Sequence, residues 1–240
     1  MNLTEQNLKF PKAFLFTFLF ILFTLLPGLI GIVPGVFDNE YFLKNAQFYF
    51  SLPFIPVIIW FIYLLKRNGI KLPEKTNQKW YLIAIILGIS FPLLQKFVLT
   101  DFYNFLFKTE YKIEYNLNYL KNFSLELFLK SISVILIFPV LEELFFREII
   151  QKRLKKNYTT LVKIIITTFL FSLIHFPFVE IVLGDQNIYY KSFFTSIFGG
   201  FLLAFLFEKS KSIGPTLLMH IIWNIFVTIP EKALQLITKL

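Results

Sequence analysis

The sequence predicts an all-α protein, a polytopic membrane bundle of about seven transmembrane helices around a polar intramembrane cavity. Hydrophobic residues make up 56% of its 240 residues and charged residues only 16%, against roughly 45–50% and about 25% in soluble domains. The 33 phenylalanines are more than one small core can bury. These values exclude a disordered chain, a collagen, a coiled coil and a disulfide scaffold. The lack of cysteine excludes a thiolate nucleophile and a cysteine-ligated metal.

Each predicted helix follows from an apolar run with few or no charges, since a spanning helix needs roughly 20 mostly apolar residues. The runs are too long for strands and do not alternate. We expect one transmembrane domain over residues 1–240. In chain order the predicted spans are 13–37, 45–65, 80–95 with an extension to 100, 127–141, 158–179, 192–207 and 212–230.

The distribution of lysine and arginine predicts the orientation in the membrane. If seven helices alternate, 14 of these residues fall on one side, in the amino terminus, in 66–79, in 151–157, at Lys163 and at Lys209 and Lys211. Nine fall on the other side. Because cytoplasmic loops are enriched in Lys and Arg, we expect a cytoplasmic amino terminus and an external carboxyl terminus, in a bacterial cell membrane. The net charge of +9 therefore reflects topology, and we expect no nucleic-acid partner.

Polar groups inside the predicted spans are the main functional signal, because a charge at the bilayer centre costs about 2.5–3.5 kcal/mol on insertion scales. Glu142 and Glu143 follow a wholly apolar stretch and point about 100° apart on a helix. Glu143 and Arg147 are four residues apart and can neutralise each other. Glu142 is left without a local partner, and a carboxylate in a poorly solvated site can accept a proton. The alternative is that all three are interfacial residues at a helix end.

Both histidines of the chain also lie in predicted spans. His175 ends an otherwise apolar stretch, where it could be a hydrogen-bonded packing residue. His220 and Asn224 share one face of the last span, where the alternative is a hydrogen-bonded clamp between helices. The convergence of so many costly groups in one cavity favours a functional site over packing.

A glutamate, a histidine and a further His–Asn pair suit hydrolysis. We expect Glu142 to take a proton from a water that His175 holds, and His220 and Asn224 to donate hydrogen bonds to the developing oxyanion. Arg147 would fix the charge state of Glu143. No His-Glu-x-x-His motif is present, no second intramembrane Asp is found, and the Gly-Ile-Ser at 88–90 lacks the features of a serine elbow.

The ordered set of motifs resembles the CPBP family, which comprises the CAAX proteases and the bacteriocin-processing or Abi proteins. The resemblance covers about residues 125–230, which we take as the catalytic core. It implies an intramembrane glutamate protease that acts on a peptide or a membrane-tethered protein. The matching residues are Glu142, Glu143 and Arg147, then Phe171 and His175, then His220 and Asn224.

Several alternatives stay open. The family has been described as metal-dependent, so Glu142, Glu143, His175 and His220 are candidate ligands for a divalent ion such as zinc, although we favour a site without an obligate metal. The same scaffold could serve a non-catalytic partner, such as a bacteriocin-immunity or regulatory protein. A proton-coupled transporter could use Glu142 and the histidines as a relay, but many transporters contain internal repeats, and none is evident here.

The depths of the candidate residues are in tension with straight helices. Glu142 would lie roughly 16 Å from the cytoplasmic edge and His175 roughly 25 Å, at 1.5 Å per residue. We expect a tilt or a deeper start of the fifth helix to remove this difference, and the fourth helix to continue to about Lys152.

Overall fold

A computed structural model describes residues 6–29, 46–110, 131–178, 181 and 190–228. Over these residues the chain is helical and has no strand, apart from an isolated bridge between Leu8 and Leu154. The elements are α1 (Phe10–Leu29), α3 (Ala46–Ser51), α4 (Phe54–Arg67), α5 (Gln78–Leu94), η2 (Gln95–Leu99), α6 (Thr100–Phe107), η3 (Ser133–Ile137), α9 (Phe138–Glu143), η4 (Leu144–Ile150), η5 (Gln151–Arg153), α10 (Thr160–Leu173), α12 (Lys191–Ser210) and α13 (Ile213–Thr228).

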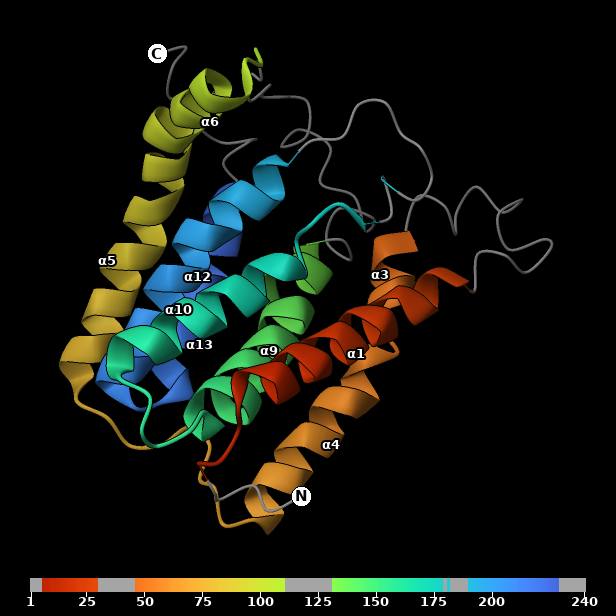
Figure 1. Ribbon diagram of the computed structural model, residues 1–240, viewed down its shortest axis with the longest axis vertical. Helices are drawn as coiled ribbons and strands as arrows, with labels where there is room; N and C mark the ends of the chain where they lie inside the picture. The colour runs from red at the N-terminus through yellow and green to blue at the C-terminus, as the bar shows by residue number, and fades with distance from the viewer. Residues whose placement is uncertain (1–5, 30–45, 111–130, 179–180, 182–189, 229–240) are drawn as a thin grey trace.

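These elements form seven helical stretches packed as a bundle, which confirms the predicted fold class (Figure 1). Within the described residues, three stretches are long and apolar enough to cross a membrane: Phe48–Arg67, Gln78–Phe107 and Lys191–Ser210. Shorter apolar helices cover Phe10–Leu25, Thr160–Leu173 and Ile213–Val227. The fourth stretch runs on through η5 to Arg153, as expected from the sequence. The predicted limits at residues 37, 45, 127, 179 and 230 lie outside the described residues.

Two predicted spans differ from the structure in their continuity. The second is interrupted at Leu52 and Pro53, between α3 and α4, where proline lacks the N–H that a helix needs. The fifth was expected to be one helix to residue 179, but α10 ends at Leu173, and His175 lies in the turn that follows. The third continues beyond the expected limit of residue 100 to Phe107.

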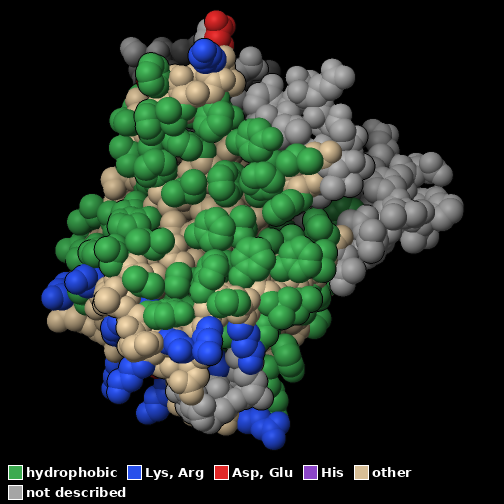
Figure 2. All heavy atoms as spheres, viewed as in Figure 1, with side chains coloured by type: hydrophobic (Ala, Val, Ile, Leu, Met, Phe, Trp, Pro, Cys, Tyr) green, Lys and Arg blue, Asp and Glu red, His purple; other side chains and the backbone are tan. Residues whose placement is uncertain are grey.

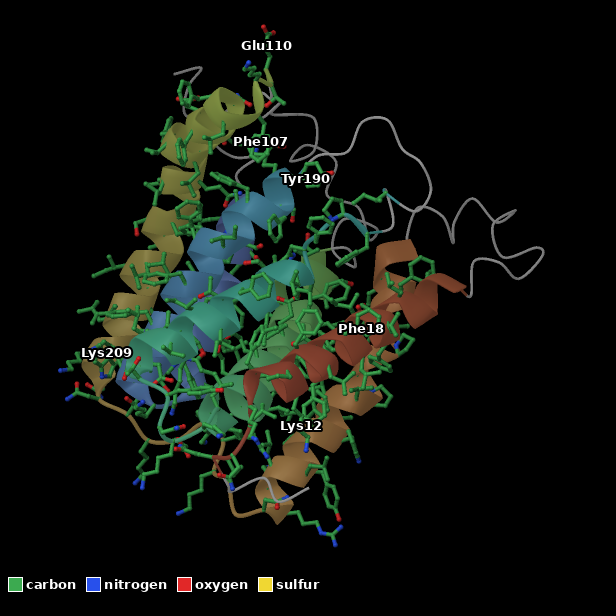
Figure 3. All side chains as sticks on the ribbon, in the orientation of Figure 1. Lys12, Phe18, Phe107, Glu110, Tyr190 and Lys209 are labelled. Carbon is green, nitrogen blue, oxygen red and sulfur yellow. The ribbon has the colours of Figure 1, made fainter. Side chains whose placement is uncertain are left out.

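Four segments that are rich in lysine and arginine meet at one end of the bundle, which we call the basic end. The backbone N–H of Leu8 donates to the carbonyl of Arg153 at 2.8 Å, and Lys152 pairs with Glu74 at 2.9 Å. The hydroxyl of Ser212 donates to the carbonyl of Glu74 at 2.6 Å. Figure 2 shows the basic side chains gathered at this end, and Figure 3 labels Lys12 and Lys209 there, with Glu110 at the opposite end. The amino terminus and the three basic loops therefore share one face, as the alternation predicts.

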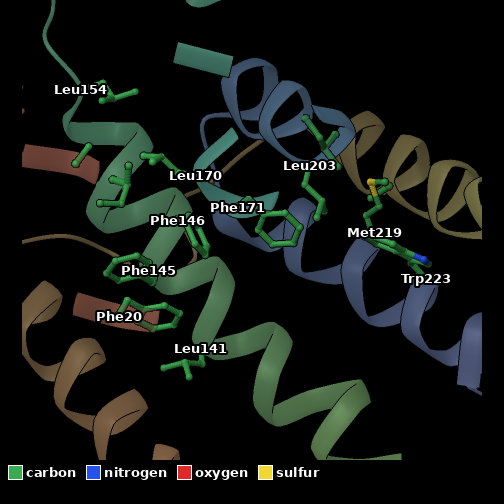
Figure 4. Packing of buried hydrophobic residues seen from close by; sticks show 14 of the residues in the cluster. Phe20, Leu141, Phe145, Phe146, Leu154, Leu170, Phe171, Leu203, Met219 and Trp223 are labelled. Carbon is green, nitrogen blue, oxygen red and sulfur yellow. The ribbon is translucent and has the colours of Figure 1, made fainter. Parts of the chain in front are cut away.

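Large aromatic and aliphatic side chains form the core between the helices (Figure 4). Phe20 of α1 stacks on Phe145 with ring centroids 4.1 Å apart, and Phe146 meets Phe171 edge to face at 5.4 Å. Many other phenylalanines and leucines are exposed on the outer surface, which Figure 2 shows as an almost continuous apolar band. Such a surface fits a lipid environment, because lipid tails are as apolar as the side chains that face them.

Two glycines of α12 allow the neighbouring helices to pack closely. A Cβ atom at Gly199 would overlap the ring of Trp223, and one at Gly200 would lie 2.8 Å from the ring of Phe171. Small residues at helix contacts are typical of membrane bundles because they let the helices approach. Here they leave room for two aromatic rings that lie beside the polar cavity described below.

We expect Gly199→Val to lower the free energy of unfolding by about 1–3 kcal/mol, the usual cost of overpacking a core. The Trp223 ring would have to move to admit the new side chain. Thermal unfolding of the purified protein in detergent measures the effect. Phe205→Leu, on the exposed surface of the same helix, is the control and should leave the unfolding temperature almost unchanged. Equal stability of Gly199→Val and the wild type would contradict the close approach.

Candidate active site

The structure brings the four predicted catalytic side chains to one cavity of about 630 Å³. They come from three of the seven helical stretches, because Glu142 is the last but one residue of α9, His175 follows α10, and His220 and Asn224 belong to α13. Apolar side chains and several hydroxyls complete the wall. The lining residues are Phe20, Thr24, Leu25, Phe50, Phe54, Gln95, Val134, Phe138, Leu141, Glu142, Ile174, His175, Ser192, Thr195, Ser196, His220, Trp223, Asn224 and Val227.

The two adjacent glutamates have different surroundings. The side chain of Glu142 is 14% exposed and lines the cavity, whereas that of Glu143 is 0% exposed and points into the bundle. Glu143 is followed by η4, a π-helical segment that holds Arg147. Segments of this kind are frequent at functional sites. Glu142 is therefore the carboxylate that a bound molecule can reach.

Glu143 holds two partners with its two oxygens. The Nε of Arg147 donates to Oε2 of Glu143 at 2.9 Å, and the Nδ1 of His220 lies 3.1 Å from Oε1. An ionised carboxylate only accepts hydrogen bonds, so Nδ1 of His220 carries the hydrogen. The Glu143–Arg147 pair predicted from the spacing is thus present, and it also orients the imidazole of His220.

The other ring nitrogen of His220 points to the cavity. Its Nε2 is 3.8 Å from Oε2 of Glu142, which is too long for a direct hydrogen bond but suited to a small polar group between them. The ring stacks on Trp223 with centroids 5.4 Å apart. His220 therefore lies between a buried glutamate that holds it and a cavity-facing glutamate that it can assist.

His175 reaches the cavity because α10 is short and oblique. α10 and α1 run diagonally to α5 in Figure 1, so the depth of His175 is less than a straight helix from residue 158 would give. The turn after Leu173 then directs the ring inward, where it meets Phe171 edge to face at 5.1 Å. The depth difference noted in the sequence is removed by tilt together with an early helix end.

Within the described part of the chain, the amide of Asn224 uses one of its two hydrogens in a structural contact. Its Nδ2 donates to the carbonyl of Val134 at 2.7 Å. In η3 the N–H of Phe138 donates to Ser133, five residues earlier, so the matching donor for Val134 would be residue 139, which is a proline without an N–H. Asn224 replaces that missing donor. The helix clamp considered from the sequence is thus present, while the second hydrogen of the amide is left for a ligand.

Gln95 and Trp223 are two of the lining residues that were not identified from the sequence. The indole Nε1 of Trp223 donates to Oε1 of Gln95 at 3.2 Å, and Trp223 also packs edge to face on Phe91 at 4.8 Å. Gln95 is an uncharged polar residue in an otherwise apolar span. The free-energy cost of burying its amide in lipid could have marked it as a site residue. Trp223 gave none, because tryptophan is common in membrane helices and interfaces.

The candidate metal ligands do not fit a metal ion well. Among the residues that the structure describes, no group of three or more His, Asp or Glu side chains is placed to hold one. Both oxygens of Glu143 and Nδ1 of His220 are already used by each other and by Arg147. A metal that used Glu143 would have to break its buried ion pair with Arg147.

We therefore expect metal chelators to leave hydrolysis by the purified protein unchanged. Peptide cleavage in detergent before and after treatment with 1,10-phenanthroline and EDTA makes the measurement. A known zinc protease in the same buffer is the control for chelator strength. Loss of cleavage that added zinc restores would contradict this expectation and bring Glu142 and the histidines back as ligands.

The fold and the cavity together define a polytopic helical membrane protein with an acid and two imidazoles inside the bundle, an arrangement suited to intramembrane hydrolysis. Residues 124–226 match the family described as type II CAAX prenyl endopeptidase Rce1-like. This part of the chain is similar to the CAAX protease family, in agreement with the resemblance carried by the motifs. The match and the apolar helices together indicate, in general terms, an integral membrane protease of the CAAX type. Neither the curated proteins nor the solved structures contain a match.

Proposed function

We propose that the protein is an intramembrane endopeptidase that hydrolyses a peptide bond with a water activated by Glu142 and His175. The observation that carries the proposal is the convergence of Glu142, His175, His220 and Asn224 on one cavity. The match of residues 124–226 to the CAAX protease family supports proteolysis in general. The substrate is a peptide or a membrane-tethered protein, and the lipid bilayer is the medium in which the enzyme works.

In the first step Glu142 accepts a proton from a water, and the water oxygen bonds to the carbonyl carbon of the scissile peptide. His175, which also lines the cavity, holds the water by a hydrogen bond. General base catalysis of this kind contributes about 10²–10⁴-fold. No hydroxyl or thiol of the enzyme is acylated, so no acyl-enzyme should accumulate.

In the second step the negative oxygen of the tetrahedral intermediate is stabilised and the C–N bond breaks. Nε2 of His220, when it carries a hydrogen, and the second amide hydrogen of Asn224 donate to this oxygen. Such donors are worth about 2.7–4 kcal/mol each in a dry site. Glu142 then gives its proton to the leaving nitrogen, which departs as an amine and leaves a carboxylic acid on the other fragment.

The test is cleavage of a peptide library by the purified protein in detergent, followed by mass spectrometry of the products. We expect His175→Ala to retain the wild-type unfolding temperature within a few degrees and to lose most of the cleavage. The matched control is Phe176→Ala, a neighbouring change in the same turn that leaves the imidazole in place. Full cleavage by His175→Ala would contradict the role of this ring.

The same purified proteins also distinguish the proposed hydrolysis from the two alternative functions, a non-catalytic partner and a transporter. A non-catalytic partner would bind peptides without cleaving them, and wild-type and His175→Ala protein would then behave alike. A proton-coupled transporter would show pH-gradient-driven flux in liposomes. Either result without cleavage would contradict the proposed hydrolysis.

A further inference from the structure

The cavity occupies the half of the bundle that lies away from the basic end. α12 ends at the basic end with Ser210, whereas Ser192, near the start of α12 at the opposite end of the bundle, lines the cavity. α13 starts at the basic end, and its cavity residues Asn224 and Val227 are in its last turns. Thr24 lies likewise in the distal part of α1. Ser192 is also exposed, so the cavity reaches the surface at that end.

Packed side chains close the other half of the bundle. Phe146, Arg147 and Ile150, which follow the two glutamates toward the basic end, are 0% exposed. Gln151 is equally buried, and its Nε2 donates to the carbonyl of Ala204 at 2.8 Å and to Glu208 at 3.2 Å. A peptide that approached Glu142 from the basic end would have to displace this core and its hydrogen bonds.

The basic end itself has the charge expected of a cytoplasmic face. Short loops with many lysines and arginines stay on the cytoplasmic side during insertion. The described loops 68–77 and 154–159 and the segment at 209–211 are of this type. At the opposite end the described charges of α6 and the residues just after it are mixed, with Asp101, Lys108 and Glu110.

From these observations we infer that the active-site cavity opens to the extracytoplasmic side of the membrane and takes its substrate there. The substrate would be a peptide segment exposed outside the cytoplasm, beside its own membrane anchor or after export. That the bound molecule is a substrate rests on the proposed function. The side on which the cavity opens is inferred from the geometry and the charge alone.

The absence of native cysteine makes a direct test possible with single-cysteine variants of the full chain. Ser192→Cys reports on the cavity, Glu110→Cys on the end opposite the basic end, and Asn157→Cys on a basic loop. Spheroplasts of a bacterial expression host are treated with a membrane-impermeant maleimide, with and without detergent permeabilisation. The cysteine-free wild type is the control for background labelling.

We expect Ser192→Cys and Glu110→Cys to be labelled in intact spheroplasts. We expect Asn157→Cys to stay unlabelled in intact spheroplasts and to react only after permeabilisation. The inverse pattern would overturn the inference by placing the basic end outside. Labelling of Glu110→Cys but not of Ser192→Cys in intact spheroplasts would also overturn it, because the cavity would then be closed on that side. None of these results depends on hydrolysis. A failure of the cleavage assay with the expected labelling would instead contradict the proposed function alone.

Discussion

Glu142→Gln should reduce hydrolysis by about 10²–10⁴-fold, the contribution of a general base, while the protein keeps its fold. The glutamine has nearly the same shape but cannot take the proton from water. The side chain of Glu142 is partly exposed to the cavity, and its nearest ion-pair partner is 3.8 Å away. Its replacement therefore breaks no close contact. The measurements are the rate of cleavage under saturating peptide and the unfolding temperature in detergent.

The matched control is Glu148→Gln, a buried glutamate in η4 that is absent from the cavity wall. Its Oε2 accepts a hydrogen bond from Lys152 at 2.8 Å, so this variant should lose some stability and keep its rate. A rate for Glu142→Gln within a few-fold of the wild type would contradict the assignment of the base. Equal losses of rate in both variants would indicate a general effect of removing buried charge instead.

The candidate site could be predicted from the sequence because its residues are expensive in a membrane. His220 and Asn224 lie on one continuous helix, α13, so the rule for residues four apart held without correction. The pairing of Glu143 with Arg147 was predicted on the same ground and is present at 2.9 Å. In both cases the local geometry of one helix decides the contact, and the sequence contains that information.

Contacts between helices were harder to predict. The sequence predicted Arg147 as the only partner of Glu143. The structure adds a second partner, His220 of α13, which lies 77 positions further along the chain. The end of α10 was missed although the sequence marks it, because Pro177 stands four residues after Leu173 and its ring would clash with the carbonyl of Leu173 in a continued helix. Tilt and crossing angle are set by neighbouring helices and interfacial anchors, which is why the depth of His175 could not be derived from residue counts.

The amino-terminal half illustrates the same limit. α1, α3 and α4 carry no motif that pointed to the site, yet Phe20, Phe50 and Phe54 line the cavity. A phenylalanine facing the cavity and one facing lipid look the same in a sequence with so many of them. The structure shows that the first helix forms part of the cavity wall, because Phe20, Thr24 and Leu25 all line the cavity.

Arg147→Ala should lower the free energy of unfolding by about 3–5 kcal/mol, the cost of removing one partner of a buried ion pair. The guanidinium is fully buried, donates to Glu143 at 2.9 Å and to Gln151 at 3.3 Å, and lies over the ring of Phe171 at 5.4 Å. Its loss would leave the charge of Glu143 buried beside His220 alone. Arg147→Lys should recover only part of the stability, since an ammonium cannot reproduce the planar fork.

A double variant separates stability from positioning at this pair. Glu143→Leu with Arg147→Met removes both charges, and such replacements of buried pairs are often neutral or stabilising. We expect it to unfold at a temperature near that of the wild type, measured in the same detergent, but to remain poor in hydrolysis. The reason is that Nδ1 of His220 loses the carboxylate that orients the ring. Recovery of the full cleavage rate in the double variant would contradict the positioning role of Glu143, because the imidazole would then be held by packing on Trp223 and Phe171 alone.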